Sequence, residues 1–340
     1  MIYLTTYFDN NYLSRGLLLY GSLKKYCNQF TLYILCLDNS VLDYFINNSS
    51  SFPEVIALSL CEIEEKDTEL MQCKVNRSKI EYYFTLSPCL PLFLLEKYKI
   101  PHVCSLDADI LFFSDPNVIF SYLENYSILI TPHNFSKDLK HKEIYGKYNV
   151  SFQIFKNDSD GIACLNEWRR DCIDWCYDRL ENNKFADQKY LEKWSQQYDG
   201  VYEIDIIGCG VAPWNLNSYT FSYFNDCLYI NGRKIIFYHY HGLRMLNKNI
   251  VSSGLLGYNN KNNRLISKYI YKPYIKALYN IKNENDAQIM RYQTRSLFKT
   301  VLSVECYIYI NNIIVTNSLL IKIIRNFISI KKYLEHGKTH

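Results

Sequence analysis

The sequence predicts an α/β protein whose doubly wound, mostly parallel sheet is flanked by helices. Runs rich in β-branched and aromatic residues alternate along the chain with stretches in which apolar residues recur at helical spacing. Such alternation is typical of parallel sheets. Hydrophobic residues make up 48% of the 340 residues and charged residues 21%, so the chain has enough apolar material for a sizeable core.

The first part of the chain repeats a strand followed by a helix. The β-branched run at 2–8 precedes a turn-forming Asp-Asn-Asn and a helical pattern with a basic end. In order, we expect a strand at 2–8, a helix at 12–26, a strand at 31–38, a helix at 41–48 and a proline-interrupted helix at 80–99.

The next part begins with an apolar run at 102–113 that two carboxylates interrupt. Beyond it the same patterns predict further alternation of strands and helices. We expect strands at 127–133, 149–158, 201–205 and 234–242, and helices at 161–180 and 186–194.

The composition changes near residue 260. From there the chain is rich in Asn, Lys and Tyr, and residues 261–340 contain 14 Lys and Arg against 4 Asp and Glu. We therefore expect a catalytic domain at residues 1–259 and a basic, partly helical C-terminal appendage at 260–340.

The end of this appendage has an amphipathic pattern. Between Ser318 and Leu334 apolar residues recur at helical spacing, and Lys322, Arg325 and Lys332 share the opposite face. Such a helix can lie on an anionic membrane or pack on the catalytic domain. The uncharged stretch at 306–321 is too short and polar to span a bilayer. No RNA or DNA motif accompanies the charge, so we expect no nucleic-acid partner.

The N-terminus and the cysteines indicate a reducing compartment. The first residues contain no basic leader followed by an apolar run, which argues against a signal peptide or anchor. The 12 cysteines lack CxxC spacing and are interpreted as cytosolic thiols. We expect a cytoplasmic protein, with peripheral contact to the inner face of a bacterial plasma membrane if the tail binds lipid.

Asp107 and Asp109 interrupt the apolar run at 102–113. On an extended strand, side chains two residues apart leave the same face, so both carboxylates would point one way and Ala108 the other. Ligands of α/β sheets bind at strand ends, and carboxylate oxygens suit Mg²⁺ or Mn²⁺. The alternative is that the two carboxylates cap a turn.

Four further segments accompany this Asp-x-Asp motif, and the five occur in the order TTYFDNNYLSRGLLLYGSL, SLDADILFF, YNVSFQIFKND, FADQKYL and FYHYHGL. Together they resemble the family 8-like retaining glycosyltransferases of the GT-A fold, the group that includes glycogenin and bacterial lipopolysaccharide galactosyltransferases. The resemblance covers about residues 1–245. It implies a GT-A domain that binds a nucleotide diphospho-sugar and a metal ion.

The resemblance implies that a histidine of an HxxG element completes the metal site. His239 and Gly242 occupy that position, and an imidazole ligand favours Mn²⁺ over Mg²⁺. His241 is the alternative ligand. The family's following KPW segment, which contacts the diphosphate, is replaced here by LRMLNK, where Arg244 or Lys248 is left to supply positive charge.

The resemblance also implies the donor-binding residues. The first strand and its loop would place Thr6, Asp9 and Tyr12 at the uracil and ribose, although Tyr12 can equally pack on the sheet. Arg77 precedes the Asp-x-Asp motif at a distance typical of donor-binding cations, and a solvated charged loop is the alternative. Asn149 matches the start of an NxG element near the donor sugar, with a serine in place of the usual glycine.

Asp187 and Gln188 match the family's aspartate-glutamine pair, whose side chains lie against the sugar and the reaction centre. An aspartate before a helix also serves as an ordinary N-cap. For the acceptor, we name His133 and Trp214 as candidates, because an imidazole can face a hydroxyl and an indole can stack on a sugar ring. Structural packing is the alternative for both.

The sequence therefore predicts a glycosyltransferase that moves a sugar from a UDP-sugar to a hydroxyl of a glycan or lipid-linked acceptor. Metal dependence, retention of configuration and a role in bacterial surface polysaccharide synthesis follow from the resemblance. A nucleotidyltransferase that makes nucleotide sugars is one alternative, but the glycine-rich phosphate loop that it needs does not follow the first strand. A non-catalytic nucleotide-sugar-binding protein is the other.

Overall fold

The structure, a computed structural model, describes residues 1–247, 250–260, 263–284, 306–310 and 313–316. Contacts within the chain divide it into two compact units, Met1–His239 and Tyr240–His340. The change in composition had predicted a boundary between domain and appendage near residue 260. The roles predicted for the two parts, catalytic domain and appendage, stay predictions.

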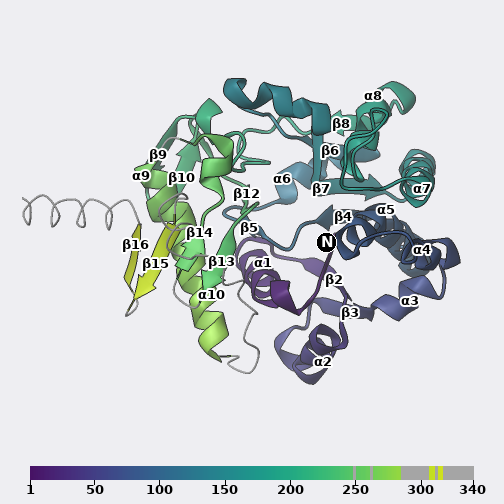
Figure 1. Ribbon diagram of the computed structural model, residues 1–340, viewed down its shortest axis with the longest axis horizontal. Coiled ribbons are helices and arrows are strands. Elements are labelled where there is room, and N and C mark those ends of the chain that lie inside the picture. Colours follow the sequence, from purple (N-terminus) through teal and green to yellow (C-terminus); the bar gives the residue numbers. More distant parts are fainter. Residues whose placement is uncertain (248–249, 261–262, 285–305, 311–312, 317–340) are drawn as a thin grey trace, which may run out of the picture. The chain divides into compact units, whose positions relative to one another are not determined.

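The first unit is built on a seven-stranded sheet with the order β3-β2-β1-β4-β7-β6-β8 (Figure 1). Every neighbouring pair is parallel except those that involve β7, which runs against β4 and β6. The mostly parallel sheet predicted from the sequence is thereby confirmed. The strands are β1 (Ile2–Phe8), β2 (Phe30–Cys36), β3 (Val55–Ser59), β4 (His102–Leu106), β6 (Ile128–Pro132), β7 (Tyr148–Lys156) and β8 (Val201–Glu203).

Helices cover both faces of this sheet, as the doubly wound prediction requires. Helices α1 and α2 pack on one face, while α3, α4, α5 and α7 bury apolar residues against the other. Figure 1 shows α4, α5 and α7 together, with α1 on the opposite side of the sheet. The α-helices are α1 (Leu13–Tyr26), α2 (Asn39–Asn47), α3 (Leu60–Glu64), α4 (Thr68–Cys73), α5 (Lys79–Tyr98), α6 (Asn117–Phe120), α7 (Ser159–Asp174) and α8 (Trp194–Gln197).

Helix α5 runs unbroken through both of its prolines, so the predicted interruption is wrong. A capping box starts the helix, because the Ser78 hydroxyl accepts from the Glu81 backbone and the Glu81 carboxylate accepts from the Ser78 backbone. Pro88 and Pro91 lie inside the helix, where packing against the sheet compensates for the hydrogen bonds that they remove.

Short 3₁₀ helices connect several elements: η1 (Asn10–Tyr12), η2 (Ser49–Ser51), η3 (Ser121–Glu124), η4 (Lys137–Tyr145), η5 (Gln188–Lys193) and η6 (Leu216–Ser218). The helix expected at 186–194 is η5, with α8 directly after it. The helix expected at 161–180 begins and ends earlier, as α7.

Two small sheets complete the first unit. Strand β5 (Ile110–Phe112) pairs antiparallel with β12 (Phe237–His239), and β9 (Phe221–Phe224), β10 (Cys227–Ile230) and β11 (Arg233–Lys234) form a meander. The tight turn before β11 uses Asn231 and Gly232, both with positive φ, which is the Asn-Gly signature of a hairpin. The single strand expected at 234–242 is therefore split between β11 and β12.

The second unit combines helices with an antiparallel sheet. Its sheet order is β13 (Arg244–Asn247), β14 (Ile250–Ser252), β15 (Cys306–Ile310), β16 (Ile313–Thr316), and its helices are η7 (Leu255–Tyr258), α9 (Arg264–Ile266), the π-helix η8 (Ser267–Tyr271) and α10 (Lys272–Glu284). The predicted helical character is present in α10, but the sheet was not predicted. Tyr240 and Tyr274 stack at its core with ring centroids 3.6 Å apart.

The amphipathic helix predicted between Ser318 and Leu334 lies outside the described residues, so membrane contact through it stays a prediction. Within the part of the chain that the structure describes, no helix has both the length and the apolar character needed to cross a membrane. The cysteines from Cys27 to Cys227 are all free, and most of them are buried.

Candidate metal and active site

The two aspartates of the Asp-x-Asp motif lie in a turn between β4 and β5, not on an extended strand. The Asp107 backbone N–H donates to the Ser151 carbonyl over 3.0 Å, and the Asp107 carbonyl accepts from the Ile110 N–H over 3.2 Å. The prediction that strand alternation aligns the two carboxylates is therefore wrong. The turn aligns them, while Ala108 is buried in the core.

His239 ends β12 and pairs in register with Ile110, which directly follows Asp109. This pairing places the imidazole Nε2 at 3.0 Å from an Asp109 carboxylate oxygen and at 3.4 Å from an Asp107 oxygen. The side chain of Asp107 is 41% exposed, whereas those of Asp109 and His239 are largely buried. The three groups therefore share a site with one open side.

The donor set of this site fits a divalent cation. One ligand atom from each of Asp107, Asp109 and His239 lies within 4.8 Å of the other two. Adjacent ligands on a cation with bonds of about 2.1 Å are about 3 Å apart in octahedral geometry, close to the separations found here. Two carboxylate oxygens and one imidazole also leave coordination positions for a substrate. The structure thus brings the three predicted ligands into one group that could hold a metal ion, while metal binding and the identity of the metal stay predictions.

The pKa values of Asp107 and His239 are shifted by desolvation and because the three side chains lie close together. Although the Asp107 side chain is 41% exposed, the protein around its carboxyl group partly shields it from water, and this partial desolvation raises its pKa to about 7. The nearby Asp109 and Asp187 carboxyl groups raise the pKa further, and His239 lowers it. Burial alone would lower the pKa of His239, but Asp109 and Asp107 together raise it above its ordinary value. A cation that binds here has to displace protons from this cluster.

Asp187 lies next in the chain to η5, and its side chain is almost completely buried. It does not cap the helix, so the N-cap alternative is wrong; instead Asp187 Oδ2 accepts from the Ser87 hydroxyl over 2.5 Å. The Asp187 carbonyl accepts from Trp168 Nε1 over 2.9 Å. Burial raises the pKa of Asp187 to about 7 although the Ser87 hydrogen bond lowers it. Gln188 donates its amide to the Tyr145 carbonyl over 2.9 Å.

The two acceptor candidates lie together beside the triad. The Trp214 ring meets the His239 ring edge-on with centroids 5.4 Å apart, and the His133 ring contacts the Trp214 ring at 5.1 Å. His133 also stacks on Phe135 at 4.6 Å. Both residues are buried, which gives them a packing role in the absence of substrate. Their role toward an acceptor stays a prediction.

Asn149 supports the Asp-x-Asp turn through its neighbour on β7. The Asn149 side-chain oxygen accepts from the backbone and the hydroxyl of Ser151, and its amide donates to the Thr131 carbonyl over 3.2 Å. The Ser151 carbonyl in turn holds the Asp107 backbone. Ser151, which stands where the resemblance implies a glycine, is therefore part of this network, and contact between Asn149 and a donor sugar stays a prediction.

The donor candidates of the first strand and loop differ in exposure. Thr6 is buried, and its hydroxyl has no hydrogen-bond partner among the described residues. Asp9 caps η1 and pairs with Lys79 over 2.8 Å. Tyr12 is 40% exposed, and the Arg15 guanidinium lies 4.1 Å from the centre of its ring. None of these contacts tests a role toward uracil or ribose.

Arg77 is buried, so the solvated-loop alternative is wrong. Its guanidinium donates to the Asn76 side chain, the Tyr177 hydroxyl and the Ile173 carbonyl, and it lies over the Tyr177 ring. These bonds tie the chain before α5 to the end of α7. A role in donor binding stays a prediction.

The remaining candidates belong to the second unit. Gly242 has a φ of 75°, and His241 meets the Tyr258 ring edge-on. Arg244 starts β13, and Lys248 lies outside the described residues. The histidine that completes the cluster of possible metal ligands is His239.

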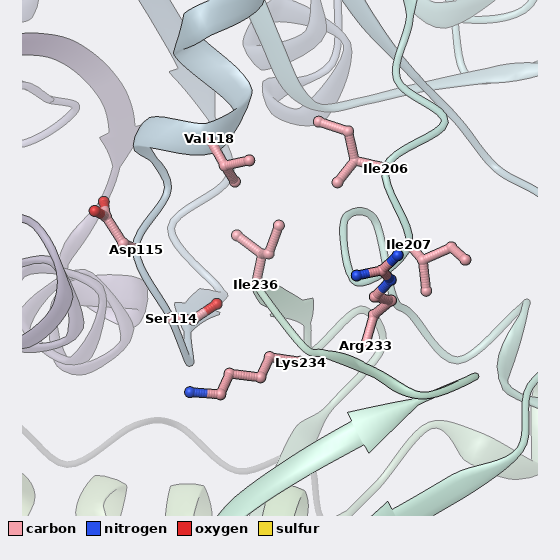
Figure 2. Close-up of a pocket in the computed structure, with 8 residues that line it drawn as sticks. All are labelled: Ser114, Asp115, Val118, Ile206, Ile207, Arg233, Lys234 and Ile236. Atoms are coloured by element: carbon pink, nitrogen blue, oxygen red, sulfur yellow. The ribbon is translucent and has the colours of Figure 1, made fainter.

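A separate cavity of about 450 Å³ lies at the other end of the β5–β12 ribbon from His239 (Figure 2). Figure 2 shows Val118, Ile206 and Ile236 pointing toward one another, with Arg233 beside Ile207. The eight residues drawn there include none of the predicted site residues. The cavity is therefore not part of the predicted site.

Sequence reasoning missed two residues of the Asp187 environment, Ser87 on α5 and Tyr7 on β1. The Tyr7 hydroxyl lies 3.0 Å from the Ser87 oxygen. One signal was present: Ser87, like Thr85, is a hydroxyl residue within a mostly apolar helical stretch. Nothing in the sequence indicated that this stretch faces Asp187.

The sequence is similar to two proteins of Bacillus subtilis (strain 168). It is 31% identical to the uncharacterized protein YfnD over 258 residues, which cover 75% of this chain and 81% of YfnD. It is 28% identical to the uncharacterized protein YfnF over 247 residues, which cover 70% of this chain and 80% of YfnF. No family model matches the chain.

Solved structures similar to this one include three glycosyltransferases. The galactosyltransferase LgtC with donor and acceptor sugar analogues is 12% identical, with 82% of this chain and 96% of that chain covered and a TM-score of 0.49. Mouse xyloside xylosyltransferase 1 is 12% identical, with 71% of this chain and 98% of that chain covered and a TM-score of 0.46. GlyE of Streptococcus pneumoniae TIGR4 is 12% identical, with 87% of this chain and 65% of that chain covered and a TM-score of 0.46. The identity and the coverage shared with YfnD show that this chain belongs to the same family as YfnD.

Proposed function

We propose that the chain is a metal-dependent glycosyltransferase of the GT-A type. It would move a sugar from a UDP-sugar to a hydroxyl of a glycan or lipid-linked acceptor, with retention of configuration. The observation that carries this proposal is the convergence of Asp107, Asp109 and His239 within 4.8 Å. The three residues come from two of the segments on which the family 8-like resemblance rests, and those segments are far apart in the sequence.

The triad would hold Mn²⁺ or Mg²⁺, and the imidazole of His239 favours Mn²⁺. Bound there, the cation supplies positive charge that offsets the charge developing on the departing diphosphate. Asp107 has the more exposed carboxyl group of the pair, so it is the ligand on the side from which a diphosphate approaches.

The sugar and the acceptor would lie next to the triad. Asp187 and Gln188 are proposed to face the transferred sugar, since the charge of Asp187 acts on Asp107 and the Gln188 amide is oriented by the Tyr145 carbonyl. Trp214 and His133 are proposed to form the acceptor wall.

The nucleotide would lie along the end of β1. The hydroxyl of Thr6 lacks a protein partner among the described residues, and Tyr12 presents an exposed ring for a base to stack on. Asp9 is proposed to accept from the ribose, Arg77 and Asn149 to border the donor, and Gly242 and Arg244 to contact the diphosphate. A role in bacterial surface polysaccharide synthesis at the inner face of the membrane is the context that we propose.

The test is sugar transfer by the full chain. UDP-glucose, UDP-galactose and UDP-N-acetylglucosamine are each incubated with the protein and Mn²⁺, Mg²⁺ or EDTA, and UDP release is measured. We expect release with one donor, abolished by EDTA, and lowered at least about a hundredfold in Asp109→Asn and His239→Ala. No release with any donor contradicts the proposal.

Matched controls separate ligand loss from general damage. His141→Ala removes an exposed imidazole and Asp43→Asn an exposed carboxylate, and both should retain activity. His241→Ala tests the rival ligand. Equal loss in His239→Ala and His141→Ala would contradict the metal role of the triad.

A further inference from the structure

Asp187 ends a chain of hydrogen bonds that crosses three elements of the first unit. Asp187 Oδ2 accepts from Ser87 Oγ over 2.5 Å, and Ser87 Oγ lies 3.0 Å from the Tyr7 hydroxyl. The Tyr7 hydroxyl lies 3.0 Å from the Tyr83 carbonyl, to which it donates. Asp187 precedes η5, Ser87 and Tyr83 belong to α5, and Tyr7 belongs to β1. The chain therefore ties the carboxyl group to the middle of the sheet.

The proton count of the chain restricts its arrangement. Each hydroxyl has one proton to donate, and the Tyr83 carbonyl can only accept. If Asp187 is ionised, Ser87 donates to it and Tyr7 donates back to Ser87 or to Tyr83. If Asp187 is protonated, it donates to Ser87, Ser87 to Tyr7 and Tyr7 to Tyr83, with one proton for each bond. Both arrangements hold the carboxyl group in the same place.

No ion pair of the described residues involves Asp187, although its carboxyl group is almost completely buried. Its backbone is fixed separately, by the Trp168 indole. Two hydroxyl groups therefore orient the Asp187 carboxyl group, that of Ser87 directly and that of Tyr7 through Ser87, and neither neutralises its charge. An uncancelled charge stays available to hydroxyl groups of a bound sugar.

We propose that Ser87 and Tyr7 are positioning residues that hold the Asp187 carboxyl group at the reaction centre of sugar transfer. The proposal rests on the proposed function. Ser87 orients the carboxyl directly, and Tyr7 acts through Ser87. Neither residue contacts the reactants, so neither is a catalytic residue.

The kinetic test compares variants of Ser87 and Thr85 on α5 and of Tyr7 on β1. Ser87→Ala removes the donor, Ser87→Thr keeps a hydroxyl, and Thr85→Val removes a buried α5 hydroxyl that bonds only within the helix, to the Glu81 carbonyl. We expect Ser87→Ala to lower kcat about tenfold or more with the KM for the UDP-sugar unchanged, and Ser87→Thr to recover most of it. Tyr7→Phe should lower kcat less than Ser87→Ala does. Thr85→Val should match the wild type.

The pH profile adds a readout that a structural role would not move. The Ser87 hydrogen bond lowers the pKa of Asp187, so its loss should shift the acidic limb of the kcat profile to higher pH. The other titratable groups that act on or beside Asp187 are Tyr7 of β1, Asp107 of the β4–β5 turn and Cys172 of α7. These groups remain in Ser87→Ala, so they contribute equally to both profiles.

Three results would overturn the proposal. The first is a Ser87→Ala variant whose kcat and acidic limb equal those of the wild type, and the second is a change in its KM alone. The third is a loss of kcat in Ser87→Ala that a folded Ser87→Thr variant does not recover. Unfolding of the metal-free protein keeps this test separate from the proposed function. The stability of the metal-free wild type should fall as the pH rises toward the pKa of Asp187. In Ser87→Ala this pKa is higher, so the fall in stability should continue to a higher pH than in the wild type. If the wild type transfers no sugar but this shift is present, the proposed function fails while the Ser87–Asp187 coupling stands.

Discussion

Replacement of Asp187 by asparagine should stabilise the metal-free protein at alkaline pH, even though it removes a proposed functional group. Burial raises the pKa of Asp187 from 3.8 to about 7. Between these two values the unfolded chain has released a proton that the native protein still holds, so stability falls as the pH rises through this window. At about 1.36 kcal/mol for each pK unit, the cost above pH 7 is about 4 kcal/mol.

Urea unfolding in EDTA, followed by tryptophan fluorescence at pH 4, 6 and 8, measures this cost. The difference in unfolding free energy between Asp187→Asn and the wild type should be smallest at pH 4 and reach about 4 kcal/mol at pH 8. The amide can still bond to Ser87. Asp43→Asn, at an exposed position, should show no such dependence. A difference that stays constant from pH 4 to pH 8 would refute the assignment of a raised pKa to Asp187.

Two further outcomes follow from the geometry. An alanine at Gly161 would place its Cβ 2.0 Å from the Lys156 carbonyl oxygen, so Gly161→Ala should lower the free energy of unfolding by about 1–3 kcal/mol. A Cβ at Gly21 in α1 meets open space, so Gly21→Ala should raise the free energy of unfolding by about 0.5–1 kcal/mol. Thermal unfolding of both variants measures these changes. Mn²⁺ should bind more tightly as the pH rises toward 7, because Asp107 must lose its proton; calorimetry that finds equal affinity at pH 5.5 and 7.5 would contradict this.

The sequence predicted those parts of the fold that short-range patterns determine. Strands β1 and β2 and helices α1 and α2 occur close to their expected ranges, because β-branched runs and helical spacing are local signals. The sheet of the second unit was not foreseen, since β14 pairs with β15, a strand far along the chain. Pairing at such a distance leaves no trace in a short window of sequence.

The residues of the candidate site likewise fall into those that the sequence could name and those that only the tertiary structure reveals. Asp107, Asp109 and His239 could be named because they lie in segments with a recognisable order. Ser87 and Asp187 are 100 residues apart, and their contact depends on how α5 and the chain before η5 pack against the sheet. Hydrogen bonds of this type are a product of tertiary structure, so composition and periodicity do not reveal them.

The reversed direction of β7 has a consequence for how relatives of this protein can diverge. Because β6 runs parallel to β1 and β7 returns antiparallel, the connection between Pro132 and Tyr148 lies at the edge of the sheet where β4 leads into the Asp-x-Asp turn. This connection contains His133 and the carbonyl that orients Gln188. Its length and sequence can change without altering any strand of the sheet. Under the proposed function, substrate preference can therefore change there while Asp107, Asp109, His239 and the fold stay the same.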